Sequence, residues 1–332
     1  MMPVWGAGAM NARLSAADTL PYLSEAFLDR LSISTHDMVA EIERQIIGQR
    51  RGEVWCAPKS VVLPGDERYI MATLGVASEP RVLATKSLIV NPRNAERGLA
   101  TLNSLITLLD SETGLPLALV DGNWVTAKRT AGLSIVAAKR LARSDSSSAA
   151  FIGCGVQARG HLDALANLFP LHEIRAFGRG ASNRDALCRM AIARGLKAVA
   201  CDTPKAAVDG ADIVVTTVTL VPEPAPFLDA HWLKAGSFTT MTDLALPWLP
   251  ETLRRFDRIV IDDLDQEAKM SKPMIRPELV AGDLTGLVCG DFSGRQSASE
   301  TTTFAFRGLA VGDLAIAGLA YLRAKAVGAL AA

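Results

Sequence analysis

The chain has 332 residues, of which 49% are hydrophobic and 21% are charged, a globular composition long enough for two domains. Its 35 basic and 35 acidic residues cancel, and no long run of one sign predicts a nucleic-acid or membrane surface. Five scattered cysteines without a C-x-x-C pair argue against a disulfide framework or structural zinc, so we expect a cytoplasmic protein.

Two segments between residues 16 and 52 favour helices. Residues 16–31 carry apolar residues at helical spacing, and residues 38–52 continue the pattern until basic residues precede Gly52, a typical helix stop. The stretch 1–20 lacks the basic start and apolar core of a signal peptide. We therefore read this region as part of a folded domain.

The next 70 residues carry patterns typical of β-strands. Short β-prone runs occupy residues 54–64, 68–77 and 81–92, and residues 102–122 read as a hairpin with its turn near 111–114. A strong helical pattern then covers residues 123–143. Helices followed by strands predict an α+β segment, and the long helix that follows could join it to a second domain.

From residue 149 onward, strand and helix patterns alternate. Strands are expected at 149–153, 173–178, 197–201, 212–219, 236–242 and 258–263, with helices at 156–169, 183–195 and 204–211. This rhythm is typical of α/β proteins with a doubly wound parallel sheet. A final helix is expected at about 303–328, long enough to pack back on the first domain; Asp313 interrupts its apolar stretch, which is too short to cross a bilayer.

A glycine motif lies between the first strand and helix of this alternating part. Gly153 would allow a tight turn, Gly155 a close approach of the backbone to a pyrophosphate, and Ala158 close helix packing. The motif predicts dinucleotide binding, with a tight turn that binds no ligand as the alternative.

The end of the second alternating strand bears on the choice of nucleotide. NAD enzymes usually carry an acidic residue there, but no acid precedes Asp185. Arg179, Ser182 and Asn183 could instead accommodate a 2′-phosphate, which favours NADP(H) over NAD(H). The alternative is that Arg179 lies solvated on the surface.

Four residues outside the glycine motif are candidates for chemistry. Lys86 interrupts an apolar strand, where a charge is costly unless it faces a cleft, the alternative being a solvent-facing position on an edge strand. Lys59 and Arg129 are further cations that would suit a carboxylate substrate. Asp243 ends an apolar strand and could exchange protons with an amine, or cap the following turn.

Other chemistries find no support in the sequence. The four histidines have no metal-ligand spacing, so no metal is expected, and neither a G-x-S-x-G elbow nor a phosphate-binding G-x-x-x-x-G-K-[ST] loop is present. A hydrolase or a phosphoryl transferase is therefore not expected.

Two motifs together resemble a known family. "VDGNWVTAKRTAGLSIVAAKRLA" followed by "AFIGCGVQARGHLDAL", with its Gln157-Ala158 pair, resembles the ornithine cyclodeaminase/mu-crystallin family, and the likeness extends over roughly residues 15–325. It implies a homodimer built from a substrate-binding and dimerisation domain, residues 1–130 completed by a C-terminal helix at 304–332. It also implies a Rossmann domain at 131–303, with the active site between the two.

The resemblance also implies residue roles. Positions matching Lys59, Lys86 and Arg129 hold the substrate carboxylate and polarise the reacting centre, and the position matching Asp243 is the acid/base of the cyclodeaminase. The cofactor-binding residues of the prediction are Gly153, Gly155, Val156, Gln157, Ala158, Arg179, Ser182, Asn183, Thr217, Val218 and Thr219.

Departures from the family pattern point toward its reductase branch. Near the C-terminus Phe306 replaces a common serine and Arg307 adds a cation, while "DDLDQEAKM" looks more like the reductases. The expected function is NAD(P)H-dependent reduction of a 2-imino acid to an L-amino acid, with Lys86 or Asp243 supplying the proton. Arg307, with Arg50 and Arg51, would allow a second substrate carboxylate, as in iminosuccinate. The alternatives are an ornithine-type cyclodeaminase and a crystallin-like nucleotide-binding protein without turnover.

Overall fold

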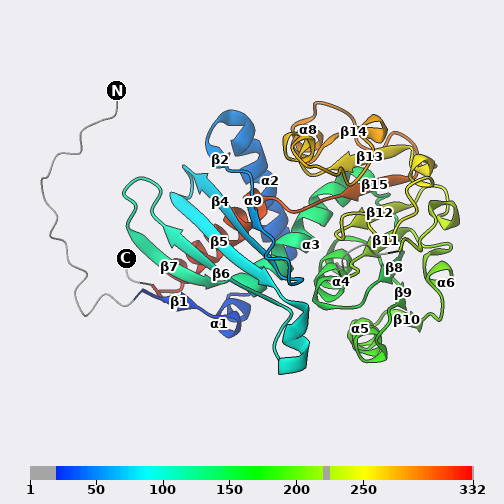
Figure 1. The fold of residues 1–332 in the computed structure, drawn as a ribbon, viewed down its shortest axis with the longest axis horizontal. Helices are drawn as coiled ribbons and strands as arrows, with labels where there is room; N and C mark the ends of the chain where they lie inside the picture. Colours follow the sequence, from blue (N-terminus) through cyan, green and yellow to red (C-terminus); the bar gives the residue numbers. More distant parts are fainter. Residues whose placement is uncertain (1–19, 220–224, 331–332) are drawn as a thin grey trace, which may run out of the picture.

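The computed structural model describes residues 20–219 and 225–330, which form two β-sheets with helices packed on them (Figure 1). The N-terminal part builds a mixed, largely antiparallel sheet, and the later part builds a parallel sheet. The prediction of an α/β protein with a doubly wound parallel sheet beside an α+β unit is confirmed.

The first sheet has seven strands in the order β1-β7-β6-β5-β4-β2, with β3 also paired to β4. Its central strands are long because apolar residues alternate across them, and Lys86 lies in the middle of β5. The strands are β1 Tyr22–Leu23, β2 Val54–Cys56, β3 Ser60–Val62, β4 Tyr69–Ala77, β5 Val82–Val90, β6 Leu102–Leu109 and β7 Pro116–Asp121.

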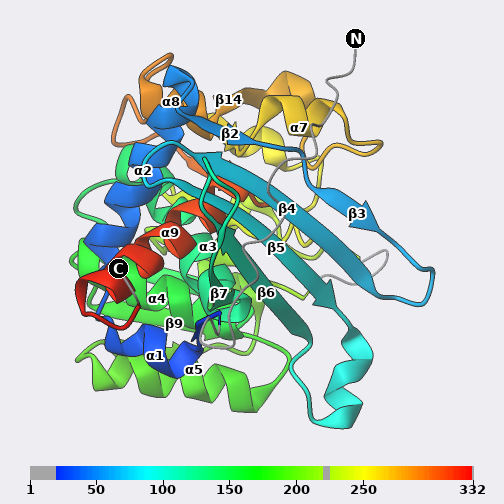
Figure 2. The same cartoon turned by 90° about the vertical axis from the view of Figure 1, so that its left-hand side faces the viewer.

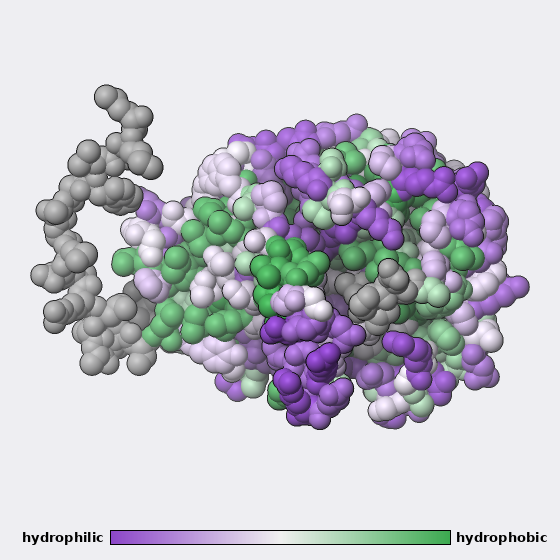
Figure 3. Space-filling view, in the orientation of Figure 1, coloured by the Kyte–Doolittle hydropathy of each residue, from purple (hydrophilic) through white to green (hydrophobic). Residues whose placement is uncertain are grey.

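The described helices cover only one face of this sheet. In Figure 2 the helices α9 (Ala310–Ala326), α2 (Thr35–Arg51) and α3 (Gly122–Leu141) lie to the left of the strands β4, β5 and β6. The face turned away from these helices carries exposed apolar side chains, which appear green over the strands in Figure 3. Those on this face include Val62, Leu74 and Leu105.

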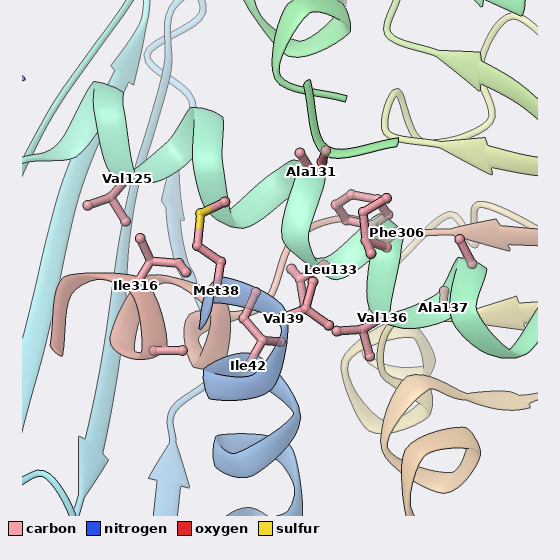
Figure 4. Packing of buried hydrophobic residues seen from close by; sticks show 14 of the residues in the cluster. Met38, Val39, Ile42, Val125, Ala131, Leu133, Val136, Ala137, Phe306 and Ile316 are labelled. Atoms are coloured by element: carbon pink, nitrogen blue, oxygen red, sulfur yellow. The ribbon is translucent and has the colours of Figure 1, made fainter. Parts of the chain in front are cut away.

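The core of this half lies where three helices meet. Figure 4 shows Met38, Val39 and Ile42 of α2 pointing toward α3 and α9, and Ile42 is fully buried. Gly132 allows this packing, because a Cβ added there would meet Ile42 Cδ1 at 2.5 Å. The helix α3 is thereby fixed between the two sheets.

The second sheet has eight parallel strands in the order β10-β9-β8-β11-β12-β15-β13-β14. The strands are β8 Ser148–Ile152, β9 Glu173–Phe177, β10 Lys197–Ala200, β11 Ile213–Thr216, β12 Phe238–Met241, β13 Arg258–Ile261, β14 Val280–Asp283 and β15 Thr302–Ala305. The helices of this part are α4 Val156–Leu168, α5 Ala181–Ala193, α6 Pro204–Val208, α7 Leu264–Ala268 and α8 Leu284–Cys289. The short helix α1, Glu25–Arg30, belongs to the first part.

Two sequence predictions of secondary structure are corrected. Within the predicted helix 16–31, residues 16–19 lie outside the described residues, Tyr22–Leu23 pair with β7, and the helix covers only Glu25–Arg30. Pro21 and the extended Ser24 account for this, because neither permits a continuous helix across them.

The predicted C-terminal helix also begins later than expected. Residues 302–305 are β15, inserted between β12 and β13, and Gly308 with φ 102° separates this strand from α9. The sequence T-T-F-A is rich in β-branched and aromatic residues, which favour a buried strand. Among the described residues, no helix has the length and apolarity needed to cross a membrane.

Candidate active site

A cavity of about 540 Å³ opens at the carboxyl ends of β8, β9 and β11. Ligands of doubly wound sheets bind at this edge. Seven of the predicted cofactor residues line it, namely Gly153, Gly155, Arg179, Asn183, Thr217, Val218 and Thr219. No aspartate or glutamate is among the described residues that line this cavity.

The two glycines of the motif have different structural roles. Gly153 has φ 88°, and a Cβ there would lie 2.5 Å from the carbonyl oxygen of Thr217, so no other residue fits without moving the chain. Gly155 is the N-cap of α4, and a Cβ there would meet no atom within 4 Å. The absence of a side chain at Gly155 therefore leaves open space beside the N-terminus of a 13-residue helix, where an anionic group is stabilised.

The other predicted cofactor residues take different positions. Val156 is exposed at the first turn of α4, while Ala158 is fully buried and packs the helix against the sheet. Gln157 turns toward α3, with its Nε2 3.5 Å from the carbonyl oxygen of Thr126. Ser182 is exposed in α5 and does not line the cavity.

The second part of the site is a buried ionic cluster. Lys86 Nζ donates to Asp313 Oδ1 at 2.6 Å, and Arg129 Nε lies 3.2 Å from the same oxygen. Thr73 Oγ1 donates to Asp313 Oδ2 at 3.1 Å. The side chains of Lys86 and Arg129 are only 0% and 8% exposed, which excludes a solvent-facing position for Lys86.

The cluster carries unbalanced charge inside the protein. Two cations share one carboxylate, and burial of Lys86 lowers its pKa to about 8 even though Asp313 opposes that change. Lys59 is close enough to Lys86 and Arg129 to lower the pKa of Lys86 further. The three predicted cations therefore converge, and such a group attracts an anion.

Lys59 also contacts the segment that joins the two halves. Its Nζ donates to the carbonyl oxygen of Arg307 at 3.1 Å, and burial lowers its pKa to about 8. The backbone N–H groups of Arg307 and Gly308 donate to Asp262 Oδ2, each at 2.9 Å. Asp262 is buried at the end of β13, and burial raises its pKa to about 6.

The guanidinium of Arg307 is not available as a further cation. Its Nε lies 2.6 Å from Glu267 Oε2, and its Nη2 donates to the carbonyl oxygen of Lys272 at 2.7 Å. Arg50 is likewise paired, with Asp291. Arg51, the third arginine behind the hypothesis of a second substrate carboxylate, is exposed and makes no ion pair with the described residues. Two of these three arginines therefore already have carboxylate partners.

Asp243 lies just beyond β12 and is 2% exposed. Thr216 Oγ1 donates to its Oδ1 at 2.9 Å, and the N–H of Val218 donates to its Oδ2 at 3.0 Å. Burial raises the pKa of Asp243 to about 6 despite these hydrogen bonds. The next two residues, Leu244 and Ala245, have φ of 59° and 56°, a left-handed conformation that costs energy for residues with a side chain.

The helix α3 and the loop after β11 link the two parts. Thr126, one turn before Arg129, faces Gln157 at the first turn of α4. Val218 both lines the nucleotide-sized cavity and binds the Asp243 carboxylate. A ligand in the cavity would therefore lie next to Asp243, and Arg129 of the cationic cluster lies on the same segment of α3 that packs on α4.

Sequence reasoning missed three residues of this arrangement, Asp313, Asp262 and Thr73. The signal for Asp313 was present, because a single carboxylate interrupts the apolar pattern of α9. Asp262 and Thr73 had no such signal, since their partners come from segments distant in the sequence.

The fold defines a two-part protein of the dinucleotide-binding dehydrogenase type. The model of the ornithine cyclodeaminase/mu-crystallin family matches residues 27–328, so the chain belongs to that family. The resemblance inferred from the sequence is thereby confirmed.

Individual relatives and solved structures are similar over most of the chain. Alanine dehydrogenase of Archaeoglobus fulgidus is 33% identical over 241 residues, covering 70% of this chain and 73% of the relative. The structure of Δ(1)-pyrroline-2-carboxylate reductase of Thermococcus litoralis, in complex with NADH and L-proline, superposes with a TM-score of 0.86 at 26% identity, covering 93% and 98% of the two chains. An archaeal alanine dehydrogenase dimer with bound NAD gives a TM-score of 0.83 at 27% identity, covering 94% and 98%.

Proposed function

We propose that the protein is an NAD(P)H-dependent reductase that converts a 2-imino acid into an L-amino acid. The observation that carries this proposal is the buried Lys86–Asp313–Arg129 cluster beside a cavity of dinucleotide-binding type. Two cations with one carboxylate leave one positive charge to bind a substrate carboxylate, and Arg129 has the fork geometry that holds a carboxylate. Related structures contain NADH with L-proline and NAD, which supports the assignment.

The residues divide the work as follows. The nicotinamide, when bound, supplies a hydride to the carbon of the C=N bond. Arg129 and Lys59 orient the substrate carboxylate, and Gly155 with the first turn of α4 holds the pyrophosphate. Closely packed α3 keeps these two binding groups at a fixed spacing.

The proton for the nitrogen comes from Lys86. With a pKa of about 8, Lys86 is mostly protonated at pH 7, whereas a pKa of about 6 leaves Asp243 mostly ionised. Ionised Asp243 instead favours a cationic iminium or ammonium group near the strand ends. The two candidates for proton transfer thus have different protonation states at neutral pH.

The cofactor cavity accepts NADH or NADPH, with NADPH preferred. Arg179 and Asn183 line it where an acidic residue would repel a 2′-phosphate, and the described residues of the lining include no carboxylate. We expect a substrate with a single carboxylate, because two of the three arginines considered for a second one, Arg307 and Arg50, already have carboxylate partners.

Two copies of this chain form a homodimer through the apolar face of the first sheet. That face lines a broad hollow of about 560 Å³ through residues of β3 to β6, and none of the described helices covers it in Figure 2. The archaeal alanine dehydrogenase of similar fold is a dimer. A Leu105→Glu variant should be monomeric by light scattering, and an unchanged assembly would contradict this arrangement. A cytoplasmic location stays a prediction.

The test is cofactor turnover by purified protein. NADH and NADPH are supplied in parallel with Δ(1)-pyrroline-2-carboxylate, with pyruvate plus ammonium and with oxaloacetate plus ammonium. We expect oxidation of the reduced cofactor with a monocarboxylate and formation of the L-amino acid. If the rate is highest with oxaloacetate plus ammonium, the hypothesis of a substrate with two carboxylates is supported instead.

A cyclodeaminase is the second candidate, and buried Asp243 with its raised pKa is the observation that favours it. Release of ammonia from ornithine with catalytic NAD⁺, without net reduction of any imino acid, would establish it. Cofactor binding without either reaction would leave the non-catalytic, crystallin-like role.

A further inference from the structure

The helix α9 carries one buried carboxylate at its first turn. Asp313 is 3% exposed, and its two oxygens receive Lys86, Arg129 and Thr73 from three different elements, β5, α3 and β4. Gly308 and Gly312 allow α9 to approach Arg129 this closely, since a Cβ at either would lie within 3.3 Å of that side chain. The contact is therefore built into the packing of the helix.

We propose that Asp313 is a positioning residue that keeps Lys86 charged and directed at the substrate while leaving Arg129 free to bind the carboxylate. This inference deepens the proposed function and rests on it for the identity of the reaction. Lys86 and Arg129 would otherwise repel each other in a dry environment, where two like charges are strongly destabilised. Asp313 is the anion that permits both to remain cationic.

The geometry distinguishes its two cationic partners. The Lys86 contact at 2.6 Å is a short, charge-assisted hydrogen bond, whereas Arg129 approaches the same oxygen at 3.2 Å without hydrogen-bond alignment. Arg129 thus retains donors for a substrate carboxylate. The groups that face Lys86 are Asp313 from α9, Arg129 from α3 and Lys59 from the segment after β2, so Asp313 is the negative one among them.

The experiment compares Asp313→Asn with Asp313→Glu and a matched control, Asp212→Asn. Asp212 is also buried and ion-paired, with Lys234, but it lies at the amino end of β11, away from the cluster. The protonation of Lys86 is followed directly by NMR of lysine labelled at Cε, assigned with Lys86→Met. The pH dependence of kcat and KM is measured on the same proteins.

The expected result for Asp313→Asn is a titration of Lys86 that moves down by about one pH unit or more, because its counter-charge is gone. The loss of kcat above neutral pH should move with it, while KM does not rise, because the competing carboxylate near Arg129 is removed. Asp313→Glu should keep the titration near that of the wild type, and Asp212→Asn should change neither quantity.

An unchanged Lys86 titration in Asp313→Asn would overturn the inference, as would a raised KM with unchanged kcat. If Asp313→Asn does not fold, Thr73→Val decides the question: loss of its hydrogen bond makes Asp313 more basic and should raise the Lys86 titration, so a fall or no change refutes the proposal. The NMR readout needs no turnover. A negative result in the reductase assay alone therefore contradicts the proposed reaction. The inference about Asp313 is then still decided by the Lys86 titration.

Discussion

Gly153 and Gly155 provide a matched pair of substitutions that separates folding from nucleotide binding. In Gly153→Ala the new methyl lies 2.5 Å from the carbonyl oxygen of Thr217, and φ is 88°. The left-handed conformation costs about 1–2 kcal/mol for alanine, and the overpacked contact adds about 1–3 kcal/mol. The apo protein should lose on the order of 10 °C in Tm.

Gly155→Ala should behave in the opposite way. Its Cβ meets no atom within 4 Å, and its φ of −76° suits any residue, so the Tm of the apo protein should stay unchanged. The methyl would occupy the space proposed for the pyrophosphate, so the Kd for NADH and NADPH should rise about tenfold or more, which is ~1.4 kcal/mol.

The assays are thermal melts of the apo proteins and fluorescence titration of both reduced nucleotides. Wild-type nucleotide affinity in Gly155→Ala would refute the placement of the pyrophosphate at this turn. A stable Gly153→Ala protein would refute the steric reasoning, whatever its affinity for nucleotide.

Three further predictions concern cofactor choice, pH and stability. Arg179→Ala should weaken binding of NADPH about tenfold and leave NADH nearly unchanged, because Arg179 is proposed to contact only the 2′-phosphate; equal losses in two parallel titrations would contradict this. The value of kcat/KM should fall as pH rises through about 8, where Lys86 loses its proton. Lys86→Met should abolish turnover while keeping nucleotide affinity. A value of kcat/KM that climbs steadily to pH 9 would argue against Lys86 as the acid. Arg307→Met should lower the free energy of unfolding by about 3 kcal/mol, because it leaves buried Glu267 unpaired. The substitution should not alter substrate preference. A free energy of unfolding equal to that of the wild type in denaturant melts would count against this pairing.

Much of the fold was predictable because periodic patterns are local. The hairpin around residues 102–122, the helix α3 and the alternation from β8 to β13 all follow from the spacing of apolar residues. Tyr22–Leu23 and β15 were not predictable, since both are strands through pairing with distant partners, β7 in one case and β12 with β13 in the other. Short segments take the structure that their neighbours impose.

The candidate site was predictable residue by residue but not as an arrangement. Lys86 and Arg129 were identifiable as charges in apolar surroundings, yet their shared partner Asp313 lies more than 180 residues further along the chain. Arg307 illustrates the opposite case, because its charge was visible in the sequence while its pairing with Glu267 was not. Ion pairing depends on which segments meet, and a single sequence does not give that information.

Transfer of a labelled hydride tests the central claim most directly. The protein is incubated with a 2-imino acid and reduced nucleotide that carries deuterium at both positions of C4 of the nicotinamide, and the amino-acid product is analysed by mass spectrometry and NMR. The account predicts one deuterium at C2 of an L-amino acid for each cofactor oxidised. Product without deuterium at C2, or oxidation of the cofactor without amino-acid formation, would contradict it.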